Sequence, residues 1–120
     1  MPERIVVSST GRVVATDVRR ARTRVERARG LLGASLDRDA ALVIEPCRQV
    51  HTFGMRYEID VAFCDASWVV VHVVRGLRPG RVTRFVRAAR RAIELPSGAL
   101  GADVVPGCAL DVAPVALGDG

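Results

Sequence analysis

The sequence has 120 residues, of which 18 are basic and 13 acidic, and its formal net charge is +5. All of the basic residues are Arg, and the chain contains neither Lys nor Asn. A Schiff-base lysine, a P-loop lysine and a Cys-His-Asn arrangement are therefore excluded, because each needs a residue type that the chain lacks. A chain of this size buries roughly two-thirds of its surface on folding. We therefore expect one domain over residues 1–113 and a mobile tail over residues 114–120.

The three cysteines constrain the redox environment and the metal chemistry. Their number is odd and no two of them form a CxxC pair. This pattern argues against a disulfide framework and against a four-cysteine zinc site. No apolar run approaches the length of a membrane span, and the first residues lack the basic-then-apolar pattern of a signal peptide. The prediction is a cytoplasmic protein without a membrane span.

The first third of the chain predicts a hairpin followed by a helix. Two short β-rich runs, at residues 5–7 and 13–15, are separated by small polar residues and a Gly, as in a tight reversal. Thr23 and Glu26 then have the spacing of a capping box, and apolar residues recur at helical intervals. The pattern predicts one short amphipathic helix over residues 23–32.

The remainder predicts mostly strands. The apolar run at residues 41–44 is typical of a buried strand, and residues 59–64 alternate with a period of two. Residues 68–74 complete a hairpin with that second strand, and residues 104–112 alternate weakly into a last strand. Residues 82–93 fit a helix by spacing but end like a strand, so their secondary structure stays open.

One segment is more specific than the rest. It consists of Val50-His-Thr-Phe-Gly-Met-Arg56 followed by Ile59-Asp-Val-Ala-Phe63, and three weaker blocks agree with it at residues 27–32, 77–79 and 94–98. Together they resemble the signature of "domain of unknown function 192", an uncharacterised family of bacteria and archaea, over residues 5–112. The resemblance implies a small, mainly β domain, either a sandwich or a compact jelly-roll-like barrel, with a helix packed on it. It implies no established activity.

Two departures from the family pattern concern residues outside that segment. Cys64 and Cys108 stand where family members more often have an aliphatic residue and an Asp. Ser67 and Trp68 replace the usual Gly-containing turn. The two cysteines are therefore poor candidates for a function shared by the family.

The loop between Cys47 and Arg56 carries the best candidate site, because it concentrates several chemically useful side chains within ten residues. We interpret it as part of a noncatalytic pocket in which His51, Thr52, Arg56 and Asp60 recognise a small polar ligand or a peptide end, since the mouths of sandwiches and barrels are common ligand sites. The chain is then a binding or accessory module, and no cofactor is predicted.

Two chemical alternatives use the same groups. In a thiol-dependent enzyme, Cys47 would be the nucleophile, His51 its base and Asp60 the group that orients the imidazole. In a metal site, Cys47, His51 and Asp60 would be the ligands. The metal alternative is disfavoured because zinc sites usually show two paired motifs, and no metal is predicted.

A purely structural interpretation also explains these residue types. His51 and Thr52 would satisfy buried backbone groups, while Phe53 and Met55 would plug the end of the sandwich. Gly54 would supply a positive φ, and Asp60 would pair with Arg56 or cap a loop amide. None of these roles needs a substrate.

Two arginine runs, at residues 19–29 and 75–91, suggest a further alternative. Between Asp65 and Glu94 there are seven Arg and no acidic residue. An anionic partner, such as a protein, a lipid surface or a nucleic acid, would fit this charge. The chain has only five aromatic residues, which disfavours a base-stacking nucleic-acid binder. Solvated arginine faces are the simpler explanation.

Overall fold

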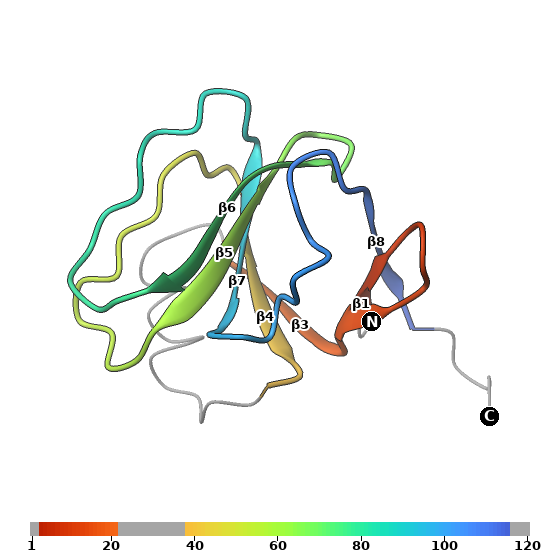
Figure 1. Ribbon diagram of the computed structural model, residues 1–120, viewed down its shortest axis with the longest axis horizontal. Helices are drawn as coiled ribbons and strands as arrows, with labels where there is room; N and C mark the ends of the chain where they lie inside the picture. Colours follow the sequence, from red (N-terminus) through yellow and green to blue (C-terminus); the bar gives the residue numbers. More distant parts are fainter. Residues whose placement is uncertain (1–2, 22–37, 116–120) are drawn as a thin grey trace.

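The computed structural model describes residues 3–21 and 38–115, which form eight strands in two sheets (Figure 1). The strands are β1 (Glu3–Val7), β2 (Val13–Ala15), β3 (Asp17–Ala21), β4 (Ala40–Ile44), β5 (Ile59–Cys64), β6 (Val70–Leu77), β7 (Arg91–Pro96) and β8 (Leu110–Pro114). The smaller sheet has the order β2-β1-β8, and the larger has the order β3-β4-β7-β5-β6. All neighbours are antiparallel except β3 and β4, which are parallel. The mainly β prediction is confirmed, and the two sheets fit a sandwich-like fold.

The larger sheet has an apolar cluster on each face. Successive residues of a strand point to opposite faces, so β5 sends Ala62 and Cys64 to one side and Val61 and Phe63 to the other. The first of these sides packs against Ile5 and other residues of the smaller sheet. The second side packs against residues from two long loops, 45–58 and 78–90. This division decides which loop residues can meet which strand residues.

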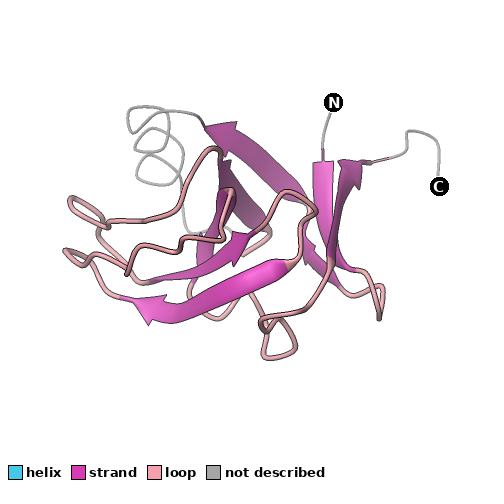
Figure 2. Cartoon of the chain, turned by 90° about the horizontal axis from the view of Figure 1, so that it is seen from above, coloured by secondary structure: helices cyan, strands magenta, loops and turns pink. Residues whose placement is uncertain are grey.

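Several predicted elements are confirmed in the structure. The hairpin at residues 5–7 and 13–15 is present as β1 and β2, and the central hairpin is present as β5 and β6. The last strand begins at Leu110, because residues 101–108 form turns. The predicted helix at residues 23–32 lies outside the described residues, and no helix occurs within 3–21 or 38–115. Figure 2 draws the described chain as strands and loops alone.

Two segments differ from a simple interpretation of their patterns. β3 carries Asp17, Arg19 and Arg20, all exposed, and so lacks the apolar alternation that identifies a strand. Its backbone pairs with the buried β4, which supplies the hydrogen-bonding partner that sequence alone does not reveal. Residues 82–90 form an irregular loop rather than a helix, and β7 begins at Arg91.

Candidate functional site

The two long loops lie side by side at one side of the molecule (Figure 1). Thr52 joins them through both its backbone and its side chain. Its N–H donates to the Arg81 carbonyl at 2.9 Å, and its hydroxyl donates to the Arg78 carbonyl at 2.6 Å. The same hydroxyl accepts a hydrogen bond from the Arg81 N–H, also at 2.9 Å. Thr52 is completely buried, so these bonds satisfy backbone groups that water cannot reach.

Further hydrogen bonds extend the pairing along both loops. The Thr83 N–H donates to the Val50 carbonyl at 2.9 Å, and the Val50 N–H donates to the Thr83 hydroxyl at 3.0 Å. The Val86 N–H donates to the Arg48 carbonyl at 2.7 Å. We refer to residues 46–57 and 79–90 together as the basic loop pair.

Every third residue of the second loop is buried. Thr83, Val86 and Ala89 face the protein, and the residues between them are exposed. Val86 and Ala89 pack in the second apolar cluster, and Thr83 bonds to Val50. A three-residue interval is close to the 3.6-residue period of a helix, which is why the sequence pattern alone left this segment undecided. The exposed positions are Arg81, Val82, Arg84, Phe85, Arg87, Ala88 and Arg90.

The basic loop pair has a strongly positive charge. Its 24 residues include six arginines and no acidic residue. These arginines are Arg48, Arg56, Arg81, Arg84, Arg87 and Arg90, and all are exposed. Glu45 and Glu58 flank the first loop, but they form ion pairs with Arg20, Arg91 and Arg78, outside the loop pair. Within residues 3–21 and 38–115, none of the six loop-pair arginines forms an ion pair with a carboxylate of that part. Burial and the nearby charge of Arg84 lower the pKa of His72, on β6.

His51 lies in the middle of the first loop, in a short bridge with Val82 of the second. Its ring stacks on Phe53 with the centroids 5.2 Å apart. Phe53 is 59% exposed and so does not plug the sandwich, whereas Met55 is buried in the second cluster. Gly54 adopts a positive φ of 84°, which favours glycine.

Cys47 lies near the start of the first loop. Its N–H donates to the Arg90 carbonyl at 3.0 Å, and its thiol contacts the Gln49 carbonyl at 3.3 Å. It lines a depression of about 390 Å³ with Pro46, Arg48 and Arg90. His51 is bridged to Val82, whereas Cys47 bonds to Arg90, eight residues further along the second loop. A nucleophile and its base need hydrogen-bond contact, and the second loop holds these two residues at different points along its length.

Asp60 lies on the opposite face of the larger sheet from the basic loop pair. On β5 it shares the face of Ala62, towards the smaller sheet. Its carboxylate accepts hydrogen bonds from the N–H groups of Gly76, Gly98 and Leu100, at 3.0, 2.9 and 3.4 Å. Asp60 is 2% exposed. The structure therefore brings it together with neither His51 nor Arg56, and it caps loop amides instead.

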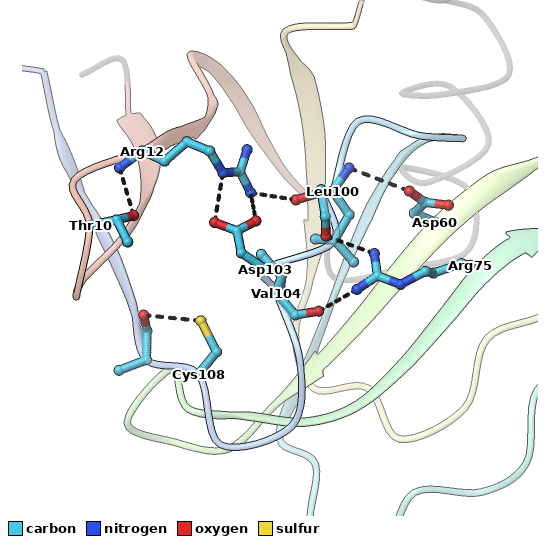
Figure 3. Close-up of polar contacts among 10 residues, drawn as sticks. Thr10, Arg12, Asp60, Arg75, Leu100, Asp103, Val104 and Cys108 are labelled. Carbon is cyan, nitrogen blue, oxygen red and sulfur yellow. Dashed lines mark hydrogen bonds and ion pairs between the residues drawn. The ribbon is translucent and has the colours of Figure 1, made fainter.

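The loop that Asp60 holds is also anchored by two arginines (Figure 3). Arg75 donates to the carbonyls of Gly101 and Val104. Arg12 donates to the Leu100 carbonyl and forms an ion pair with Asp103 at 2.7 Å, which lowers the pKa of that carboxyl. A cavity of about 430 Å³ lies beside this loop. It is lined by Asp60, Arg75, Gly76, Ser97, Gly98, Gly101 and Ala102.

A second buried carboxylate was not singled out from the sequence. Glu94, on β7, is completely buried on the face that carries the second cluster. Burial and the charge of Glu94 raise the pKa of Tyr57, in the first loop. Glu94 belongs to residues 94–98, one of the three weaker segments of the family resemblance. Its burial could not be predicted from that segment, because it depends on the position of β7 in the middle of the sheet.

The comparison with known protein families confirms the family that the motif at residues 50–63 predicted. The pattern of DUF192, a family described as "Uncharacterized ACR", matches residues 5–112. The chain belongs to the DUF192 family. No curated protein matches it. Within residues 3–21 and 38–115, no helix has the length and apolar character needed to cross a membrane, and no three metal-ligating side chains cluster together.

Two solved structures share the fold of this DUF192 chain. A protein of unknown function from Novosphingobium aromaticivorans superposes with a TM-score of 0.72 at 18% identity, covering 92% of this chain and 84% of the other. A Sinorhizobium meliloti protein described as a "putative transcription regulator" superposes with a TM-score of 0.70 at 19% identity, covering 92% and 91%. At these identities the likeness shows the fold alone.

Proposed function

We propose that this protein is a noncatalytic binding module and that the basic loop pair binds an anionic partner. The observation that carries the proposal is the concentration of six exposed arginines on the basic loop pair, which contains no acidic residue. The two glutamates that flank its first loop, Glu45 and Glu58, form ion pairs with arginines outside the pair. Like charges held this closely repel one another, and an anionic partner would relieve that repulsion.

The construction of the surface also supports binding. Thr52 and the bonds between Val50 and Thr83 fix the two loops to each other. Met55, Val86 and Ala89 fix them to the core. A surface held in this way loses little conformational freedom when a partner binds.

The candidate residues take distinct roles in this proposal. Arg56 contacts the partner, Thr52 holds the loops together, and His51 supports the exposed ring of Phe53. Asp60 stabilises a different loop, on the other face of the sheet. Because Cys47 and His51 are held at different points of the second loop, by Arg90 and Val82, binding is a better explanation than thiol chemistry.

Heparin chromatography with a salt gradient tests the proposal. The double variant Arg84→Gln/Arg87→Gln removes two charges from the basic loop pair. The control Arg4→Gln/Arg19→Gln removes two exposed charges from β1 and β3, so both variants have the same net charge. Each lost contact with an anion lowers the salt dependence of binding by about one unit of slope.

The proposal predicts that the loop-pair variant elutes at clearly lower salt than the wild type and that the control elutes close to the wild type. Equal elution of the two variants would mean that net charge alone determines retention. That result would overturn the proposed surface.

A further inference from the structure

We propose that the anionic partner is single-stranded nucleic acid, an inference that rests on the proposed function and names the partner of the same surface. The small number of aromatic residues disfavoured a base-stacking binder, but the exposure and position of two of them favour one. The chain has three Phe residues, and one of them, Phe63, is completely buried. The other two, Phe53 and Phe85, are each 59% exposed, and both belong to the basic loop pair.

The exposure of these rings calls for a ligand that can cover them. Five large apolar side chains are exposed among the described residues, and three of them are Phe53, Val82 and Phe85. Neither ring is needed to fill the core, because Val50, Val86 and other aliphatic residues of the loops already do so. Exposed aromatic rings beside cationic groups are the pattern that single-strand binders use, since bases stack on the rings while cations contact the phosphates.

At Phe53, the stacked ring of His51 also supports a surface on which bases stack. It lies 5.2 Å from the Phe53 ring, with an angle of 25° between the planes. His and Phe are both side chains on which unpaired bases stack. The stacked pair therefore lies beside the hydrogen bonds by which Thr52 joins the first loop to Arg81 of the second.

The arginines suit the same ligand. Arg81, Arg84 and Arg87 follow one another at three-residue intervals along the exposed side of the second loop. Their planar guanidinium groups bind phosphate through paired hydrogen bonds and can also stack on bases. A row of such groups follows a nucleic-acid backbone, and the rings at Phe53 and Phe85 lie within the same loop pair.

Other anionic partners explain less of the surface. An acidic peptide would neutralise the arginines but would not account for two exposed phenyl rings. In a duplex the faces of the bases are already stacked, and its grooves are usually read by an inserted helix or β-ribbon. A single strand, whose base faces are free, contacts the arginines through its phosphates and the phenyl rings through its bases.

Fluorescence anisotropy with a labelled oligothymidylate of about 20 nucleotides, long enough for several stacked bases, tests the inference. Labelled polyglutamate and a duplex of the same length are compared at the same salt concentration. The variants are Phe53→Ala and Phe85→Ala, and Val82→Ala is the control, because Val82 is also exposed on the loop pair but carries no ring. All three positions are exposed, so the substitutions leave the fold intact, which the fluorescence of Trp68 verifies.

The expected result is tighter binding of the oligothymidylate than of polyglutamate or the duplex. Each Phe→Ala variant weakens oligothymidylate binding by about fivefold or more, in line with the loss of one stacked base. The same variants change polyglutamate binding less than about twofold, as does Val82→Ala with either ligand.

Two outcomes separate this inference from the proposed function. If polyglutamate binds as tightly as the oligothymidylate and neither Phe variant discriminates between them, the partner is not a single strand, while the basic surface stands. If the duplex binds best, the single-strand inference is equally overturned. If none of the polyanions binds even at low salt, the proposed function itself fails.

Discussion

Replacing Asp60 by Ala should destabilise the protein substantially without involving the basic loop pair. The carboxylate accepts three backbone hydrogen bonds, from Gly76, Gly98 and Leu100, at a site that is 2% exposed. Net contributions of hydrogen bonds to a charged group are about 1.5–3 kcal/mol each. The bond to Leu100 is long at 3.4 Å and contributes less. The cavity beside Asp60 also lets water reach some of the freed amides, so we expect a loss of about 3 kcal/mol.

Urea unfolding measures this change directly, with the fluorescence of Trp68, the single tryptophan, as the signal. Asp60→Asn keeps the shape of the side chain and one acceptor oxygen but places an NH₂ group against backbone donors. It should cost about 2 kcal/mol, less than Asp60→Ala. Asp111→Ala, at an exposed position on β8, is the matched control and should change the unfolding free energy by less than about 0.5 kcal/mol.

The reasoning would be refuted if Asp60→Ala unfolded at the same urea concentration as Asp111→Ala. The three amide bonds would then contribute nothing measurable, and a role for Asp60 in ligand recognition would return. Unchanged heparin elution of the folded Asp60→Asn variant would show that the carboxylate and the basic loop pair act independently.

Two further predictions follow from local geometry. Gly101→Ala should destabilise the protein by about 2 kcal/mol, because the residue has a φ of 87° and an added Cβ would displace the Arg12 guanidinium from the Leu100 carbonyl and Asp103. Gly80→Ala, at a φ of 74° but with open space around it, should cost only about 1 kcal/mol, and equal midpoints in urea would disprove the clash. Burial raises the pKa of the Cys64 thiol to about 12, so iodoacetamide at neutral pH should modify Cys47 and Cys108 long before Cys64. Mass spectrometry of the partly labelled protein measures the order, and early labelling of Cys64 would contradict it.

A departure from the family pattern has a visible structural counterpart. Trp68 stands where the family more often has a Gly-containing turn, and its φ is 64°, a conformation that favours glycine. Its ring packs under the guanidinium of Arg91, at 4.1 Å, with Arg20 at 5.7 Å. Cation–π contacts of this kind contribute about 0.5–2 kcal/mol, which is comparable to the cost of about 1–3 kcal/mol for a residue held at such a φ.

The sequence predicted the two strands that are buried along their whole length, β4 and β5. Alternation identified β5, and an apolar run identified β4, because burial in those strands depends on a local pattern. The motif from Val50 to Phe63 established the family. The sequence also pointed to the loop around His51 and to the capping role of Asp60, one of the two structural roles predicted for that carboxylate.

Only the tertiary structure decided which candidate residues meet. Thr52 and Arg56 precede Asp60 by only eight and four residues, yet β5 turns Asp60 to the opposite face of the sheet. Likewise, Phe85 has the spacing of a core residue, but the second loop buries Thr83, Val86 and Ala89 and leaves the ring exposed beside Arg84. Composition and spacing show only which side chains are near one another along the chain. Their exposure and pairing depend on non-local hydrogen bonds between two loops some thirty residues apart, about which a local pattern carries no information.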